Sequence, residues 1–164
     1  MSEVLAPCAG AVRPVTESVD EVFAGQLVGP GVVIDPPDGR ASVLAPIGGT
    51  VMKVHPHAFV VVGDGTGVLV HLGINTVRLE GQGFEVLVEQ GATVAAGDPM
   101  IAWDPSSLPS EVAGQPISRE VPVIVLDAAP DSVNLSGAPQ RVVAGDLLFA
   151  VEGEPGARPG RPRR

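Results

Sequence analysis

Two short sequence patterns each occur twice in this chain. Residues 4–12 (Val-Leu-Ala-Pro-Cys-Ala-Gly-Ala-Val) return as residues 43–51 (Val-Leu-Ala-Pro-Ile-Gly-Gly-Thr-Val), and residues 94–101 return as residues 142–149 around a shared Gly-Asp. Each copy is a short strand, a glycine-containing turn and a second strand. Two copies of each pattern are too few for a solenoid. The repeats therefore predict an all-β fold, an antiparallel β-sandwich or barrel with an internal pseudo-repeat.

The composition favours the same fold class. Hydrophobic residues make up 45% of the chain but aromatic residues only 3%, so the core must consist of Val, Leu, Ile and Ala. The 21 glycines and 17 prolines fit many turns between short strands. We expect at most one or two short helices, one of them within residues 106–114. Further strands are predicted at residues 32–35, 59–62, 68–71, 84–88 and 121–126.

One domain is expected over residues 1–152, followed by a disordered Gly/Pro/Arg tail over residues 153–164. Up to residue 152 the chain has 6 basic and 18 acidic side chains, which disfavours nucleic acid or anionic lipid as a partner. Cys8 is the only cysteine, and no signal sequence or long apolar run is present. We therefore expect a cytoplasmic protein without membrane insertion, and a monomer.

All three histidines, His55, His57 and His71, fall within seventeen residues. The Asp-Gly turn at residues 64–65 predicts a hairpin between the strands at residues 59–62 and 68–71. Counted outward from this turn, His57 and His71 reach the same end of the hairpin, where facing side chains are about 5 Å apart. Gly73 follows closely, and a backbone carbonyl nearby could fix the tautomer of His71. We interpret the pair as a functional site and His55, before Pro56, as an exposed loop residue.

These histidines lie in strings that resemble the active-site signature of glucose-type enzyme IIA proteins of the bacterial phosphoenolpyruvate-dependent sugar phosphotransferase system. The strings are His57-Ala58-Phe59 and Val70-His71-Leu72-Gly73-Ile74-Asn75-Thr76-Val77. The resemblance continues through Val4–Pro7, Val22–Ala24, Leu44–Pro46 and Leu79–Phe84 to Gly145-Asp146, about residues 4–150 in all. It implies the duplicated-hybrid-motif form of the β-sandwich, which agrees with the internal repeats.

The resemblance implies a phosphoryl carrier, a phosphotransferase component that works through a phosphohistidine. His71 would accept a phosphoryl group from the carrier HPr and pass it to a cysteine of the IIB domain of a sugar permease, while His57 would donate a hydrogen bond to the phosphoryl oxygens. We expect Gly73, Thr76 and His55 to support the phosphoryl site. The expected partner-docking residues are Asp20, Val22, Phe23, Val28, Phe59, Leu69 and Asn75.

Three positions depart from the family pattern. Asn75 replaces the usual Asp, Leu69 replaces a Phe, and His55 stands where the family commonly has a small hydroxyl residue. These changes bear on docking of HPr and on the hydrogen-bond partner of His57.

Two other protein classes share parts of the pattern. Lys53 in Val-Met-Lys-Val faintly resembles the modified lysine of biotinyl or lipoyl carrier domains, but it is predicted in mid-strand instead of at a hairpin tip. His55-Pro56-His57 imitates the ligand pair of zinc peptidases of the lysostaphin-like type, yet no histidine precedes His55. No cofactor is required by the carrier interpretation, although His57 and His71 could bind zinc adventitiously.

Overall fold

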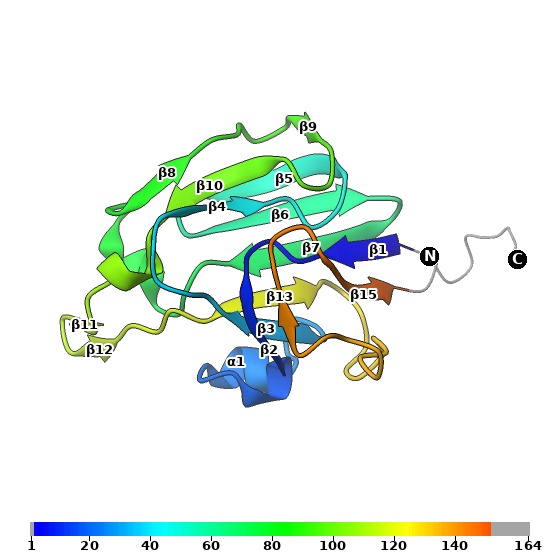
Figure 1. The fold of residues 1–164 in the computed structure, drawn as a ribbon, viewed down its shortest axis with the longest axis horizontal. Coiled ribbons are helices and arrows are strands. Elements are labelled where there is room, and N and C mark those ends of the chain that lie inside the picture. The colour runs from blue at the N-terminus through cyan, green and yellow to red at the C-terminus, as the bar shows by residue number, and fades with distance from the viewer. Residues whose placement is uncertain (1, 152–164) are drawn as a thin grey trace, which may run out of the picture.

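The computed structural model describes residues 2–151, so the predicted tail at residues 153–164 lies outside the described residues. Antiparallel strands account for most of its regular secondary structure, as predicted (Figure 1). The strands are β1 (Ser2–Leu5), β2 (Gly10–Pro14), β3 (Gly31–Asp35), β4 (Ala41–Leu44), β5 (Gly49–His55), β6 (Ala58–Gly63), β7 (Thr66–His71), β8 (Phe84–Val86), β9 (Thr93–Val94), β10 (Pro99–Trp103), β11 (Glu111–Val112), β12 (Gln115–Pro116), β13 (Val121–Val125), β14 (Arg141–Val142) and β15 (Leu147–Val151). One α-helix, α1 (Glu21–Ala24), and three 3-10 helices, η1 (Val15–Glu17), η2 (Thr76–Leu79) and η3 (Pro105–Ser107), complete the elements.

One large sheet and two smaller ones enclose the main core. The large sheet has the order β14-β2-β3-β13-β7-β6-β5-β9, and the smaller sheets are β4-β10-β8 and β1-β15. The core between them contains Val, Ile and Leu side chains and the single Trp103, which is 1% exposed. A second, small cluster lies on the outer face of the large sheet, where α1 covers β3, β13 and β7 through Phe23, Val33 and Ile124.

The repeats pair with one another as two equivalent halves. The strands β1 and β2 of the first repeat pair with β15 and β14, whereas β4 and β5 of the second pair with β10 and β9. The two Leu-Ala-Pro turns exchange reciprocal hydrogen bonds, from Leu5 N to Pro46 O (2.8 Å) and from Leu44 N to Pro7 O (2.9 Å). The predicted pseudo-symmetry is thus confirmed.

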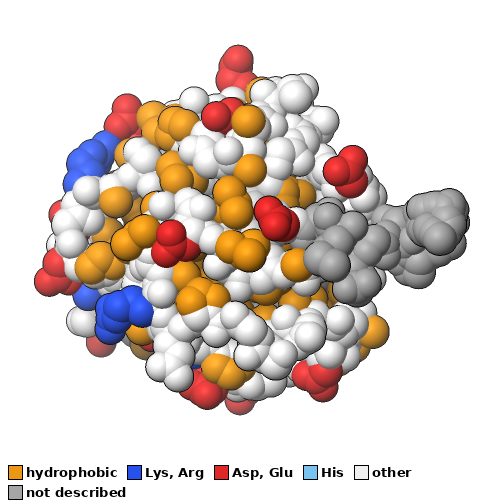
Figure 2. Space-filling model, turned by 45° about the vertical axis from the view of Figure 1, so that its right-hand side comes forward, with side chains coloured by type: hydrophobic (Ala, Val, Ile, Leu, Met, Phe, Trp, Pro, Cys, Tyr) orange, Lys and Arg blue, Asp and Glu red, His pale blue; other side chains and the backbone are white. Residues whose placement is uncertain are grey.

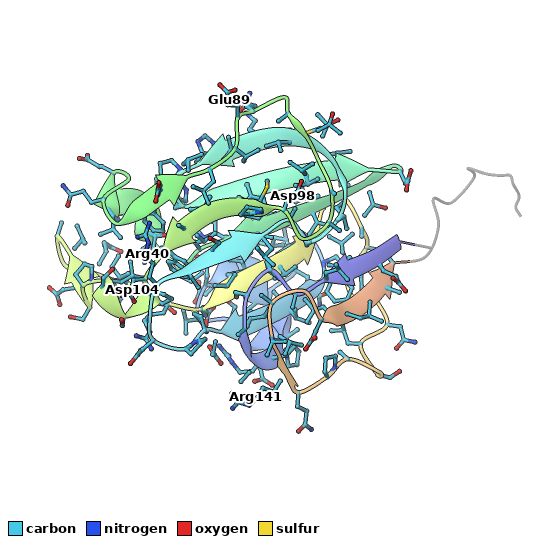
Figure 3. All side chains as sticks on the ribbon, turned by 45° about the horizontal axis from the view of Figure 1, so that its top comes forward. Arg40, Glu89, Asp98, Asp104 and Arg141 are labelled. Carbon is cyan, nitrogen blue, oxygen red and sulfur yellow. The ribbon has the colours of Figure 1, made fainter. Side chains whose placement is uncertain are left out.

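The two Gly-Asp turns are also equivalent, and their carboxylates are structural, as expected of Asp in a turn. Asp98, in the turn between β9 and β10 (Figure 3), accepts a hydrogen bond from Ala95 N at 2.9 Å. Asp146, between β14 and β15, accepts one from Val143 N at the same distance. Each carboxylate closes its turn onto the backbone three residues earlier.

The predicted helix within residues 106–114 is wrong. After the single 3-10 turn η3, residue Leu108 is extended (φ −70°, ψ 137°), because the following Pro109 disfavours the helical conformation before it. The chain then forms the β11–β12 hairpin, whose turn holds Ala113 and Gly114 at positive φ. Gly114 serves this hairpin turn and does not end a helix.

Candidate functional site

The β6–β7 hairpin brings His57 and His71 together, as its Asp-Gly turn predicts. Ala58 pairs with His71, and Leu72 N donates to His57 O at 2.7 Å just beyond the ladder. The ring centroids of His57 and His71 are 5.2 Å apart, with the planes at 71°. His57 itself lies in the two-residue turn between β5 and β6.

His55 joins this pair and lies in a strand instead of the expected loop. It is the last residue of β5, exposed as predicted, and its ring stacks on that of His57 with centroids 5.8 Å apart and planes at 22°. We refer to His55, His57 and His71 as the histidine cluster. His57 therefore has a ring contact with His55 in addition to the one with His71.

Alternation along β7 puts His71 on the outer face of the large sheet. Thr66, Val68 and Val70 are buried in the main core, whereas Gly67, Leu69 and His71 alternate outward. Helix α1 covers that outer face, and Phe23 packs edge-on against His71 with ring centroids 5.5 Å apart. His71 is consequently half-buried, with an apolar ring on one side and His57 on the other.

A backbone carbonyl fixes the tautomer of His71. Its Nδ1 lies 2.5 Å from Gly73 O. A carbonyl oxygen only accepts, so the neutral ring must carry its proton on Nδ1, and the lone pair is on Nε2. Gly73 has φ +82°, and the bridge between Ile74 and Ser118 holds the loop that carries it. Nε2 is therefore the atom of His71 that can act as a nucleophile.

Both rings are neutral near pH 7. Burial is the largest cause that lowers the pKa of His71, although the hydrogen bond to Gly73 and the charge of Asp20 raise it. Burial also lowers the pKa of His57, to about 4, and its neighbours His71 and His55 lower it further because each opposes a second positive charge. A neutral imidazole can both donate and accept a hydrogen bond, as the predicted roles require.

The predicted support residues act in different ways. Gly73 accepts from His71 directly, whereas Thr76 is fully buried and its hydroxyl donates to Leu72 O at 2.7 Å. Thr76 thus holds the loop after β7. Asn75 caps η2 in the left-handed conformation and donates through Nδ2 to Pro116 O at 2.8 Å.

Most of the predicted docking residues lie on α1, beside it in the chain, or on the outer face of the large sheet that carries His71. Asp20 caps α1 by accepting from Val22 N and Phe23 N. The side chain of Val22, in the first turn of this helix, is 48% exposed. Val28 and Leu69 are half-buried against the small outer cluster. Phe59 does not belong with them. It pairs with Val70, points into the main core and is 1% exposed, so its prediction as a docking contact is wrong.

Residues 2–130 match the family described as phosphoenolpyruvate-dependent sugar phosphotransferase system, EIIA 1. The chain belongs to this family. The predicted resemblance is therefore confirmed over most of the described residues, and this EIIA chain carries the histidine cluster within the matched region.

Individual relatives agree. The glucose-specific EIIA component of Bacillus cereus is 41% identical over 104 residues, which is 62% of either chain. The N-acetylglucosamine-specific EIICBA component of Klebsiella pneumoniae is 36% identical over 158 residues, 94% of this chain but 23% of that protein. The solved structure of glucose permease IIA from Mycoplasma capricolum superposes with a TM-score of 0.76 at 32% identity, covering 90% of this chain and 93% of that one. The matches thus span less than two thirds of these Bacillus and Klebsiella relatives.

The two alternative classes gain no support. Lys53 lies within β5, where it pairs with Val60, and so is not at the tip of the β5–β6 hairpin. Among residues 2–151, no group of three or more His, Cys, Asp or Glu side chains could hold a metal ion, so the histidine cluster alone lacks the ligand set of a catalytic zinc site. In the same part of the chain, no helix is long and apolar enough to cross a membrane.

Sequence reasoning missed one group beside the site. Arg13 and Ser18, from the segment that leads into α1, converge on Glu120, which directly precedes β13. The only available signal was an acidic residue directly before the apolar run of β13. Its partners lie about a hundred residues away in sequence, so nothing local pointed to them.

Proposed function

We propose that this EIIA chain is a cytoplasmic phosphoryl carrier that accepts a phosphoryl group on His71 Nε2 from phosphorylated HPr. It then passes the group to a cysteine of the IIB domain of a sugar permease. The observation that carries the proposal is the Nδ1 contact of His71 with Gly73 O, which leaves Nε2 free beside a second neutral histidine. The family membership supports the same reaction.

The transfer needs no base, because the nucleophilic lone pair is already present. His71 Nε2 attacks phosphorus, the new N–P bond forms, and the N–P bond of the donor phosphohistidine breaks with its electron pair returning to the donor nitrogen. The His71 ring gains positive character while Nδ1 keeps its proton, and the Gly73 carbonyl and the charge of Asp20 favour that charge. In the second step the thiolate sulfur attacks phosphorus, and the electron pair of the N–P bond returns to Nε2.

His57 and α1 serve the phosphoryl group around this nitrogen. Phosphoryl transfer depends mainly on positioning and on stabilising charge at the equatorial oxygens. An N–H of neutral His57, at this ring separation, is suited to donate to such an oxygen. Phe23 covers one side of His71 and limits the access of water, which would otherwise hydrolyse the phosphohistidine.

Charge on the protein suits a basic partner at an apolar docking face. Exposed Val19, Val22 and Val77 lie on segments next to the histidine cluster, together with Asp20. Figure 2 shows carboxylates scattered over one face of the protein and around its outline, with basic side chains gathered at the left. The chain itself requires no cofactor in this proposal, and zinc at His57 and His71 remains a separate prediction.

Mass spectrometry tests the proposal directly. After incubation with phosphoenolpyruvate, enzyme I and HPr, the wild-type chain should gain about 80 Da in an acid-labile form. His71→Ala should gain nothing. His57→Gln leaves His71 Nε2 in place, so this variant should still gain the phosphoryl group. It should both accept the group and pass it on more slowly than the wild type. A wild-type chain that gains no mass, or a His71→Ala variant that does, would refute the proposal.

A further inference from the structure

Glu120 is a buried carboxylate outside the histidine cluster, and other residues connect it to His71. It directly precedes β13, and its side chain is 2% exposed. Its Oε1 accepts from Arg13 Nη2 at 3.0 Å, and its Oε2 accepts from Ser18 Oγ at 2.5 Å and from Val19 N at 3.1 Å. The hydrogen bonds of this carboxylate therefore all go to residues 13–19, the segment that leads into α1.

Packing alone does not account for such a group. A carboxylate is rarely this buried unless it is paired, and the free energy that its desolvation costs is about as large as the pairing returns. An apolar side chain would fill the space without that cost. Unlike an apolar side chain, the carboxylate makes directional hydrogen bonds. It accepts from a hydroxyl, a backbone N–H and a guanidinium at once and so fixes their relative positions. Arg13 is fixed in turn by two bonds to Asp35, of 2.7 and 2.9 Å.

The contacts of Glu120 lead to His71 through three residues, Ser18, Asp20 and Phe23. Ser18 Oγ, while donating to Glu120, accepts from Asp20 N at 3.1 Å. Asp20 Oδ1 then accepts from Val22 N and Phe23 N and so begins α1. Phe23 packs on the ring of His71. A helix of one turn has little stability of its own, so its place on the sheet depends on these contacts.

The same short segment reaches His71 from the other side. Glu120 N donates to Ser118 Oγ at 3.2 Å, and Ser118 O accepts from Ile74 N at 2.9 Å. That bridge holds the loop whose Gly73 carbonyl fixes the tautomer of His71. Residues 118–120 thus contact both the loop that carries the Gly73 carbonyl, through Ile74, and the segment that leads into α1, through Ser18 and Val19.

We propose that Glu120 is a positioning residue of the His71 site, one that holds α1 over the histidine through Ser18 and Asp20. Its effect on phosphoryl transfer rests on the proposed function, whereas its effect on His71 is a property of the chain alone. Displacement of α1 removes Phe23 from the ring of His71. The ring then becomes more hydrated, and the geometry around Nε2 is no longer fixed on that side.

The experiment compares Glu120→Ala with Glu85→Ala. Glu85 lies on β8 in the β4-β10-β8 sheet and is also paired with an arginine, at 2.6 Å from Arg40 (labelled in Figure 3). The control therefore removes the same group and the same charge. NMR titration should show that the pKa of His71 rises in Glu120→Ala toward its ordinary value, because burial is the main cause of its depression. Hydrogen exchange at residues 19–24 should accelerate. Neither should change in Glu85→Ala.

Phosphorylation kinetics give the functional arm. The rate at which His71 gains phosphate should fall roughly 10-fold to 100-fold in Glu120→Ala, the range expected when a reacting group is misplaced by about 1 Å. A purely structural role would lower the melting temperature but leave the pKa of His71 in the folded protein unchanged. Ser18→Ala, which removes only the connecting hydroxyl, should shift the pKa and the exchange in the same directions, and it serves if Glu120→Ala does not fold.

The outcomes separate the two proposals. Unchanged pKa and exchange in a folded Glu120→Ala or in Ser18→Ala overturn the positioning role, even if the wild-type chain is phosphorylated. A shifted pKa in a chain whose wild type gains no phosphate supports the positioning role and refutes the carrier function.

Discussion

Replacement of Gly73 by alanine tests how tightly the nucleophile's support is built. Gly73 has φ +82°, and a Cβ placed there would lie 2.6 Å from Thr76 Cγ2 and 2.7 Å from Ser118 O. Ser118 O belongs to the backbone that bridges to Ile74, so this atom cannot move away from the new Cβ unless the loop moves with it. The variant therefore combines backbone strain with a steric clash.

Gly91 provides a matched control for the strain. It has φ +92°, and no atom lies within 4 Å of a Cβ built there. The left-handed conformation costs a non-glycine residue roughly 1–2 kcal/mol, and overpacking adds about 1–3 kcal/mol. We therefore expect Gly91→Ala to lower the free energy of unfolding by roughly 1–2 kcal/mol and Gly73→Ala to lower it by roughly 2–5 kcal/mol.

Urea unfolding followed by fluorescence measures both variants, because the single Trp103 is fully buried and reports loss of the core. The slope of the free energy against urea should stay unchanged, so that midpoints can be compared. The NMR signals of His71 should change in Gly73→Ala only, since the displaced carbonyl no longer accepts from Nδ1. Equal losses of stability in the two variants, or an unaltered His71 in Gly73→Ala, would refute the reasoning.

Three further predictions follow from local geometry. Burial and the neighbouring histidines lower the pKa of His57 in the folded chain to about 4, whereas in the unfolded chain His57 binds a proton below its ordinary pKa of 6.5. The free energy of unfolding should therefore fall as the pH drops from 6.5 to 4, because only the unfolded chain gains the proton in this range. Urea midpoints across this range should show a less steep fall in His57→Gln. Asp98→Ala and Asp146→Ala should each lower the free energy of unfolding by about 1 kcal/mol, because the two carboxylates make equivalent turn bonds. Burial raises the pKa of Cys8 to about 12, so its thiol should react with a disulfide reagent at pH 8 only after unfolding.

Each of these has a clear contrary result. If the free energy of unfolding depends on pH equally in the wild type and in His57→Gln, His57 does not contribute to the loss of stability in acid. A cost confined to one of the two aspartates would mean that the repeat turns are not equivalent in energy. Rapid labelling of Cys8 in the native chain would show that its core opens readily.

The sequence alone determined the features that depend on short-range pattern. The repeated Val-Leu-Ala-Pro and Gly-Asp strings predicted the two equivalent halves, because segments with the same pattern of apolar residues and turns bury the same side of their strands. The Asp-Gly turn set the β6–β7 hairpin, and with it the meeting of His57 and His71, since a two-residue turn fixes the register of both strands. Phe59 could have been placed by the same register, because it pairs with Val70 on the buried face of the sheet and not with the outward Leu69.

Only the tertiary structure decided what depends on distant partners. The tautomer of His71 rests on a carbonyl whose position is set by a bridge to Ser118, more than forty residues away in sequence. Glu120 meets Arg13 across a separation of 107 residues, and neither residue has a local signal for the other. Local sequence sets turns and alternation, whereas the direction of a buried carboxylate or carbonyl is fixed only when separate segments pack around it.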